Sequence, residues 1–413
     1  MRLERRVRLQ TWGGGRLAPL ESRSTPTLIR GHVIESAAEL GSIVDQWDEL
    51  AVEASEPFCS PAWMLAWWRN AAPADAALRA VAVLDGRELV GVAPMFAQRG
   101  TSGLARYALL ASPMSLRAAP LARRGREQEA AAAIAEALAM ASPYPDIVTF
   151  AGIGQISSWP SLLQRAWPGS RRPLLFEEQT IPAPYVSLEG RSFDEWFASK
   201  SPNFRQQIRR RRRQLEAAGA VFRLAAADEV VRDLRAFAAL HHARWRPRGG
   251  SGVLDQNVER MLEDVAPVLA ANGRMRVFAI DVEDRPISVQ IFVGTGGEFS
   301  YWLGGFDAAW SAQQPSMQGL VAAIEHAFHA GDGVLDLGGG GPPYKYRLAN
   351  EEVLLEWSTL VLPGARFLLA RGAVAARTTR RSISKRLPRE TRHRLRRVRS
   401  ALRRTDRPRR ADR

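Results

Sequence analysis

Residues 274–307 read RMRVFAIDVEDRPISVQIFVGTGGEFSYWLGGFD, and turn signals divide this stretch into three runs typical of β-strands. These runs are Arg274–Val282, Pro286–Val293 and Glu298–Gly305. A helical pattern follows at about Ser316–Ala330, and the short buried strand Val334–Leu337 comes after it. An antiparallel meander with a crossover helix and a further strand predicts a mixed sheet flanked by helices.

The same order of elements occurs earlier in the chain. Its strand-like runs are Leu78–Leu84, Glu88–Phe96 and Leu104–Leu110, and an Ala-rich helix at about Arg126–Met140 precedes the buried strand Asp146–Phe150. The segment AVLDGRELVGVAPMF of the first half corresponds to AIDVEDRPISVQIFV of the second. We interpret the chain as an internal duplication, which predicts an α/β fold (α+β mixed sheets) of two units in tandem.

Length and composition predict the limits of these units. A chain of 413 residues suits two domains better than one. Residues 1–30 mix Gly, Ser, Pro and Arg without periodicity, so we expect a disordered leader. We place the N-terminal unit at 31–180, the C-terminal unit at 181–362 and a basic tail at 363–413.

The net charge of +15 is concentrated at the C-terminal end. Residues 366–413 hold 19 Lys and Arg against 3 Asp and Glu, and the rest of the chain holds 39 basic and 40 acidic residues. A nearly neutral body with no recognised nucleic-acid module argues against nucleic acid as its partner. In the tail, apolar and basic positions alternate, which suits peripheral contact with anionic lipid, while a solvated tail or a nucleic-acid contact are the alternatives.

The sequence lacks the motifs of several common kinds of functional site. The only cysteine is Cys59, which excludes a disulfide framework and a Cys-rich metal site, and we expect it to be a small buried hydrophobe. The chain contains no P-loop, HExxH or GxSxG motif, and we expect no metal. No apolar run reaches the roughly 18 residues that span a bilayer, so we expect a cytoplasmic protein.

Two segments that follow strands are candidates for binding anions. Gln314–Gly319 opens a helix, where unpaired amides can bind phosphate; an ordinary Pro-initiated helix is the alternative. Asp336 ends a buried strand, and four glycines, Gly338–Gly341, permit close approach of a ligand. Tyr344, Lys345 and Arg347 come directly afterwards, and sites in open α/β sheets gather at such strand ends.

Two further candidates lie on predicted helices. His241 can accept the proton that a nucleophilic amine must lose, and Trp245 shares its helix face; a core-edge histidine is the alternative. Arg205 begins an arginine-rich stretch on a helix at about Asn203–Ala218. Most of these arginines are expected to be solvated, with one or two available to meet phosphates.

Six stretches, in this order, resemble the CelD-like acetyltransferase family of the GNAT superfamily, and more distantly the Fem-type aminoacyltransferases. They are PFCSPAWMLAWWRN at 57–70, LVGVAPMF at 89–96, SKSPNFRQQIRRRRRQLEAAG at 199–219, LHHARW at 240–245, RPISVQIFVGTGGEFSYWLGGFD at 285–307 and DLGGGGPPYKYRL at 336–348. The resemblance implies a tandem GNAT fold and an acyl-CoA donor such as acetyl-CoA. Fem-type proteins use aminoacyl-tRNA, so an aminoacyl transferase is the nearer alternative.

The resemblance also implies roles for particular residues. The pantetheine of the donor would lie along Ser300–Gly305 and its pyrophosphate at the following helix start, so the expected donor-binding residues are Gly304, Gly305, Gln314, Ser316, Met317, Gln318 and Gly319. The helix start departs from the usual Gln/Arg-x-x-Gly-x-Gly/Ala loop. The expected catalytic residues are His241, Asp336, Tyr344 and Lys345, with His241 or Asp336 as the base. The residues expected to bind the acceptor, an amine or a sugar hydroxyl, are Arg205, Trp245 and Arg347.

Overall fold

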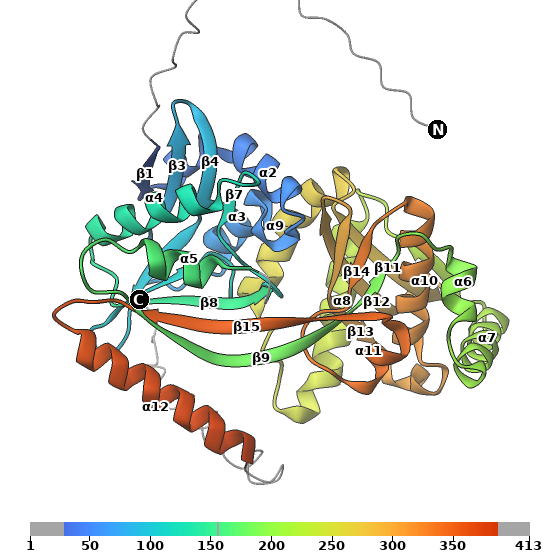
Figure 1. Cartoon of the computed structure of the whole chain (residues 1–413). Helices are drawn as coiled ribbons and strands as arrows, with labels where there is room; N and C mark the ends of the chain where they lie inside the picture. Colours follow the sequence, from blue (N-terminus) through green and yellow to red (C-terminus); the bar gives the residue numbers. More distant parts are fainter. Residues whose placement is uncertain (1–28, 155–156, 387–413) are drawn as a thin grey trace, which may run out of the picture.

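The computed structural model describes residues 29–154 and 157–386, which form two lobes joined by long strands (Figure 1). The first half contains the helices α1 (Ala37–Gly41), α2 (Val44–Glu53), η1 (Pro57–Cys59), α3 (Pro61–Asn70), α4 (Glu127–Met140) and α5 (Trp159–Ala166). Its strands are β1 (Arg30–Ile34), β2 (Ala77–Leu78), β3 (Ala80–Asp85), β4 (Glu88–Ala93), β5 (Met95–Arg99), β6 (Ala105–Leu109), β7 (Leu121–Ala122), β8 (Ile147–Gly154) and β9 (Leu174–Ser187).

The second half is richer in helix. Its helices are α6 (Phe193–Ala198), α7 (Pro202–Ala217), α8 (Val230–Trp245), η2 (Arg246–Arg248), α9 (Gln256–Ala271), η3 (Ala308–Gln313), α10 (Pro315–Ala330), α11 (Pro343–Leu348) and α12 (Phe367–Arg386). Its strands are β10 (Val221–Leu224), β11 (Met275–Val282), β12 (Arg285–Thr295), β13 (Glu298–Phe306), β14 (Val334–Asp336) and β15 (Glu351–Val361). None of the helices in the described part of the chain has the length and apolar character that crossing a bilayer requires.

The predicted mixed α/β architecture is confirmed, and the topology repeats between the halves. In the second half, β11, β12 and β13 form an antiparallel meander, and β14 is parallel to β13 after the crossover helix α10. In the first half the expected meander is divided between two sheets, because the predicted strand Glu88–Phe96 forms β4 and β5. The strands β3 and β4 are antiparallel in a four-stranded sheet of order β1-β3-β4-β7, whereas β5 and β6 are antiparallel, and β8 is parallel to β6 after α4, in the larger sheet. The second meander turns at Glu283 and Asp284, which both have positive φ, as a two-residue hairpin of type I′ requires.

The last strands of the two halves join them into one sheet. β9 pairs antiparallel with β14 of the second half, and β15 pairs antiparallel with both β9 and β8. The result is an eleven-stranded sheet in the order β10-β11-β12-β13-β14-β9-β15-β8-β6-β5-β2, and β8, β15 and β9 run together between the lobes in Figure 1. The unit boundary that we placed between residues 180 and 181 falls within β9.

Side chains also cross between the halves. The ring of Trp63 meets that of Trp302 with a centroid distance of 5.8 Å, and Trp302 Nε1 donates to the carbonyl of Met114. Asp48 forms an ion pair with Arg274 at 2.6 Å. Cys59 is fully buried in the same core, as expected for a small hydrophobe. The halves therefore share one core as well as one sheet.

The start of the basic tail is a helix that packs on the body. Ala370 and Val374 of α12 are buried against Leu104, Ile147 and Val361. The leader at residues 1–28 and the tail from residue 387 onward lie outside the described residues.

Candidate functional site

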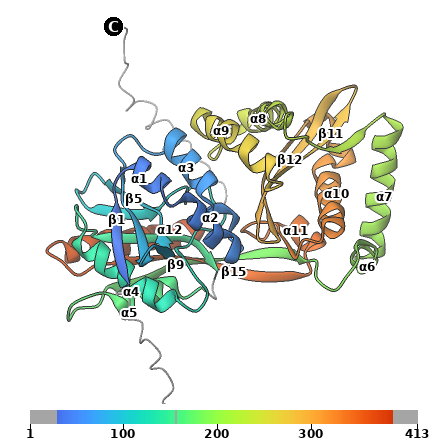
Figure 2. The same ribbon diagram turned by 90° about the horizontal axis from the view of Figure 1, so that it is seen from above.

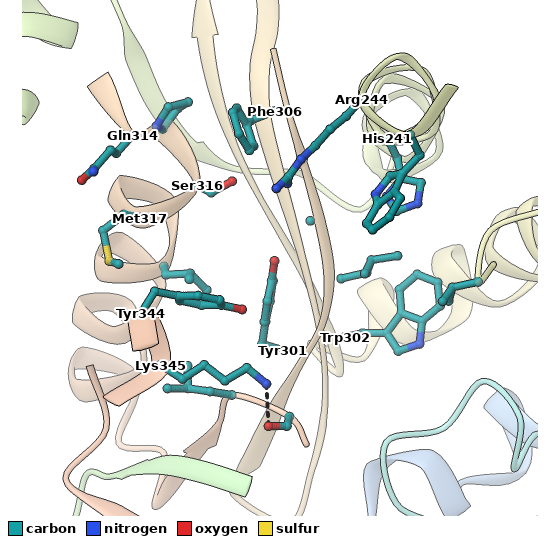
Figure 3. A pocket seen from close by; sticks show the side chains of 18 of the residues that line it. His241, Arg244, Tyr301, Trp302, Phe306, Gln314, Ser316, Met317, Tyr344 and Lys345 are labelled. Atoms are coloured by element: carbon teal, nitrogen blue, oxygen red, sulfur yellow. Dashed lines mark hydrogen bonds between the residues drawn. The ribbon is translucent and has the colours of Figure 1, made fainter. Parts of the chain in front are cut away.

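A cavity of about 590 Å³ lies in the second half, between α8, β13, α10 and α11 (Figure 3). This volume is typical of sites for small molecules and cofactors. Its lining includes aromatic, basic and glycine residues, among them His241, Arg244, Trp245, Ser251, Tyr301, Trp302, Gly304, Phe306, Gln314, Ser316, Met317, Gly338, Tyr344, Lys345 and Arg347. Leu116 of the first half also lines it. No cluster of His, Cys, Asp and Glu suited to a metal ion occurs among the described residues.

The cavity exists because β13 and β14 separate. Their parallel pairing covers only Glu298–Ser300 against Val334–Asp336. Beyond that point Trp302 is an extra residue in β13, because Tyr301 pairs with Phe292 and Leu303 already pairs with Ile291. Such a β-bulge bends a strand. The remainder of β13 therefore has no partner on the β14 side, and its Tyr301–Gly304 stretch lines the cavity.

The start of α10 divides the predicted donor-binding residues into two groups. Gln314, at positive φ, and the first-turn residues Ser316 and Met317 line the cavity. Gln318 and Gly319 lie on other faces of the helix. Gln318 Nε2 donates to the Ile208 carbonyl of α7 at 3.3 Å, and Gly319 packs against the side chain of Gln290. Helical periodicity explains this division, because consecutive residues point in directions 100° apart.

Of the two predicted donor-binding glycines of β13, only one lines the cavity. Gly304 lines the cavity. A Cβ at Gly304 would lie 2.1 Å from Gln290 Oε1 and 2.5 Å from Tyr301 Oη, so only glycine fits there without displacement of these groups. Gly305 faces α8 instead, where a Cβ would lie 3.1 Å from the Phe237 carbonyl oxygen. It permits close packing of α8 on β13 and is not part of the cavity wall.

His241 lies on the inner face of α8 and is only 3% exposed. Its Nε2 is 2.9 Å from Ser251 Oγ. That oxygen already accepts bonds from the amides of Val253 and Leu254, so its hydroxyl hydrogen is available to donate to the imidazole. Burial lowers the pKa of His241, and nearby His242 and Arg244 lower it further. The imidazole is therefore neutral at pH 7 and able to accept a proton.

Asp336 and Lys345 hold the glycine loop. Asp336 is buried and does not line the cavity; it accepts bonds from Ser300 Oγ at 3.3 Å and from the Gly338 amide at 2.8 Å. Lys345 Nζ lines the cavity but donates to the carbonyls of Gly338 and Gly339 at 2.7 and 2.9 Å (Figure 3). Burial lowers the pKa of Lys345 to about 8. Both side chains thus bind the loop, and the catalytic roles that we expected for them stay predictions.

Tyr344 lines the cavity as predicted, and so does Tyr301, which lies in the predicted donor-binding stretch Ser300–Gly305 but was not named as a site residue. Figure 3 shows the hydroxyl of Tyr344 on α11 pointing toward the ring of Tyr301 on β13, whose own hydroxyl lies beside Gly304. Burial raises the pKa of both phenols, so each stays protonated near neutral pH. Tyr301 lies within a strand that the sequence predicts, but no local sequence pattern predicts the bulge beside it.

The predicted acceptor-binding residues have different locations. Trp245 lines the cavity, with its ring centroid 5.9 Å from that of His241. Arg347 also lines it and donates to Gln207 Oε1 of α7 at 2.9 Å. Arg205 instead lines a separate groove on α7 with Arg209, Arg212 and Arg213. The basic residue that the structure adds is Arg244, whose guanidinium lies 4.6 Å from the centre of the Phe306 ring.

A buried group of charges lies where β13 leaves β14. Arg117 of the first half forms ion pairs with Glu298 and Glu56, and the charge of Asp336 lies nearby. Burial raises the pKa of Glu298 to about 7, although Arg117 opposes this shift. The first half thus contributes a cation to the base of the strand pair that opens into the cavity.

Comparisons with known proteins agree with this topology. Residues 202–346 match the family described as the acetyltransferase (GNAT) domain, and no curated protein gives a significant match to the sequence. The structure of FemX is similar at 10% identity and a TM-score of 0.55, over 76% of this chain and 95% of that one. The C-terminal domain of a putative lysylphosphatidylglycerol synthetase from Agrobacterium fabrum is similar at 12% identity and a TM-score of 0.51, over 81% of this chain and 96% of that one.

A conserved protein of unknown function from Bacteroides thetaiotaomicron is also similar, at 12% identity and a TM-score of 0.51, over 80% of this chain and 99% of that one. At such identities the likeness to solved structures establishes a shared fold. The match over 202–346 covers His241, the bulged strand, the start of α10 and the glycine loop. Most of the cavity lining therefore lies within residues 202–346, the segment that is similar to the acetyltransferase (GNAT) domain.

Proposed function

We propose that this protein transfers an acyl group from an acyl-CoA to an amine, or to a sugar hydroxyl, as a CelD-like member of the GNAT superfamily. The observation that carries the proposal is the cavity between the separated strands β13 and β14, which ends at the start of α10. The GNAT match over residues 202–346 supports acyl transfer in general. The CoA donor, the acceptor and the assigned residues are the specific content of the proposal.

The residues at the start of α10 fit an anionic donor. The first amides of a helix have no partner within the helix, and they carry partial positive charge. Ser316 supplies such an amide at the cavity wall, because Pro315 occupies the first helical position and the Met317 amide already donates to the Gln314 carbonyl at 3.0 Å. Arg244 and Arg347 add positive charge to the same cavity. A pyrophosphate can be bound there, and the unpaired edge of β13 can receive an extended amide chain.

The chemistry requires a proton acceptor and a donor to the oxyanion. The acceptor amine attacks the thioester carbonyl carbon, and its surplus proton passes to the neutral imidazole of His241, directly or through Ser251 Oγ. Free amides on the unpaired edge of β13 near Gly304 can stabilise the oxyanion. The carbon–sulfur bond then breaks, and the CoA thiolate leaves and takes up a proton. This assignment omits Asp336, because its carboxylate is buried outside the cavity.

The acceptor side of the cavity is aromatic and basic. Trp245, Trp302 and Phe306 offer ring faces, and Arg244 and Arg347 offer positive charge. Aromatic faces stack on sugar rings and other flat groups, and guanidinium groups bind carboxylates and phosphates. We therefore propose an acceptor that carries a ring and an acidic group next to the nucleophile.

Calorimetric titration of acetyl-CoA, a longer acyl-CoA and free CoA tests the donor. We expect micromolar binding of at least one acyl-CoA, and about tenfold weaker binding by Arg347→Ala, because a charge-assisted contact contributes about 1.5 kcal/mol or more. Arg235→Ala is the matched control, since Arg235 is an exposed arginine of α8 paired with Glu263 outside the cavity. Absence of binding to all three ligands would contradict a CoA donor.

A Fem-type aminoacyl transferase is the second candidate. The observation that favours it is the fold shared with FemX over 76% of this chain. Its donor would be an aminoacyl-tRNA, and the arginine groove on α7 provides a basic surface at the start of the segment that matches the GNAT domain. Binding of aminoacyl-tRNA in filter retention, combined with no calorimetric response to acyl-CoA, would favour this candidate over the first.

A further inference from the structure

Between Ala370 and Arg381, the inner face of α12 makes contacts with the body. Ala370 and Val374 are buried in an apolar cluster. Farther along the helix, Arg377 and Arg381 form ion pairs with Glu178, whose side chain is only 5% exposed. These contacts fix the rotation of the helix about its own axis. They therefore determine which residues of α12 face outward.

The outer face of α12 is apolar along its centre and basic along its sides. Leu368 is 77% exposed and Leu369 is 52% exposed. On a helix with 100° per residue, Leu368, Gly372, Ala375 and Thr379 form one outward stripe, and each of them is exposed. Arg371 and Arg380 are exposed on either side of this stripe. We call these eight positions, Leu368, Leu369, Arg371, Gly372, Ala375, Ala376, Thr379 and Arg380, the outer face of α12.

The outer face continues into a strongly basic segment. Residues 366–413 carry 19 Lys and Arg against 3 Asp and Glu, and the rest of the chain is close to neutral. Figures 1 and 2 both place α12 with the first half of the molecule, away from α7 and α10. The basic outer face is therefore separate from the cavity and from the arginine groove of α7.

We propose that the outer face of α12 binds the surface of an anionic lipid bilayer, with the helix axis parallel to the membrane. An interfacial helix inserts its apolar residues between the headgroups while flanking arginines contact lipid phosphates. Nucleic acid offers phosphates but no apolar layer for exposed leucines such as Leu368. A second copy of this chain would present the same excess of positive charge, which disfavours self-association. A bilayer matches both properties of the face.

The proposal is tested by flotation of the full chain with lipid vesicles. We expect binding to vesicles containing phosphatidylglycerol and little binding to pure phosphatidylcholine. Leu368→Asp combined with Leu369→Asp should weaken the binding at least about tenfold, because the leucines lose their apolar insertion and the aspartates are repelled by the lipid. The matched control is Val268→Asp on α9, which is 53% exposed and should bind as the wild type does.

Three results would overturn the proposal. They are no binding to either vesicle, equal binding by the double variant and the Val268→Asp control, and complete displacement from vesicles by a duplex oligonucleotide at equal phosphate concentration. The second result would assign the binding to charge alone. A thermal melt checks that both variants keep the wild-type fold. Calorimetric titration of acyl-CoA on the double variant should be unchanged, so failure of this proposal is distinguishable from failure of the proposed enzyme activity.

Discussion

His241, which we propose as the base, is buried but lies at the cavity wall. The ring is packed between Phe237 and Trp245, with centroid distances of 5.6 and 5.9 Å, and the cavity reaches it from the side of β13. The adjacent His242 differs in each respect, because it is partly exposed, pairs with Glu259 and does not line the cavity. Two neighbouring histidines therefore differ in burial, in their partners and in access to the cavity, because they face different sides of one helix.

Substitution of His241 by alanine should lower kcat by about 10² or more, the usual consequence of losing a general base. His242→Ala is the matched control and should stay within a few-fold of the wild type, because it does not line the cavity. Steady-state kinetics with the acyl-CoA that binds in calorimetry measures both variants. Equal kcat values for the two variants would exclude His241 as the base.

The pH dependence follows from the lowered pKa of His241. The neutral imidazole is the active form, so kcat/KM should increase with pH through this pKa and then level off. Because burial lowers the pKa of His241 below the ordinary 6.5, the midpoint of the increase should lie below pH 6.5. A pH–rate profile between pH 4.5 and pH 8 measures it. An acid limb centred above pH 7 would indicate a different group.

Lys345 should act on the loop more than on the reaction itself. Lys345→Met removes the donor to the carbonyls of Gly338, which is buried, and Gly339, and the unsatisfied buried carbonyl costs about 1–3 kcal/mol of stability. We expect a lower urea midpoint together with a raised KM, since the loop lines the cavity. Unchanged stability with a large loss of kcat would instead assign Lys345 a direct catalytic role.

At the scale of elements, the separation of β13 from β14 produces the cavity. The bulge at Trp302 bends β13, and the side chain of Gln290 on β12 fills the space beside Gly304 and Gly319. The helix α10 can approach β12 closely because Gly319 has no side chain. Small residues on β13 and α10 thus set the width of the cavity.

Gly304→Ala tests this dependence on small residues. Its Cβ would overlap Gln290 Oε1 and Tyr301 Oη, so both side chains must move, at a cost of about 1–3 kcal/mol for overpacking. We expect reduced acyl-CoA affinity and a lower melting temperature. Gly41→Ala on α1 is the control, because a Cβ there meets nothing within 4 Å. Wild-type affinity and stability in Gly304→Ala would contradict this account of the cavity.

At the scale of the whole molecule, neither half of the chain completes its own sheet. β14 pairs with β9 from the first half, and β8 pairs with β15 from the second. Arg117 and Trp63 of the first half contact Glu298 and Trp302 of β13, at the base of the cavity and beside it. The first half therefore supports the segment of the second half that matches the GNAT domain.

Because the halves share strands and core, residues 29–386 should unfold in one cooperative transition. Calorimetry and tryptophan fluorescence should give the same midpoint. A chain that ends at Asn350 lacks β15, exposes the edges of β8 and β9, and should not show this transition. Two separate transitions in the full chain would show that the halves are independent domains.

The sequence by itself determined the order of elements and much of the site. Strand runs, the turn at Glu283 and Asp284 and the proline-initiated helix at Pro315 depend on local backbone preferences, so short stretches predict them. The helix face shared by His241 and Trp245 follows from spacing alone, and both residues line the cavity. Sequence thus identified the three segments that surround the cavity.

Only the tertiary structure decided how those segments meet. Strand exchange between the halves, the bulge at Trp302 and the contribution of Leu116 depend on pairing between residues far apart in the chain. Asp336 and Lys345 were predicted as catalytic. In the structure the glycine loop folds back, so that the Gly338 amide donates to Asp336 and the Gly338 carbonyl accepts from Lys345. Gln318 and Arg205 were predicted at the site because residues near them in the sequence suited it. In the structure Gln318 contacts α7, and Arg205 lines the separate groove on α7. Local preferences determine which elements form, and the burial of side chains between distant elements determines which residues face the cavity.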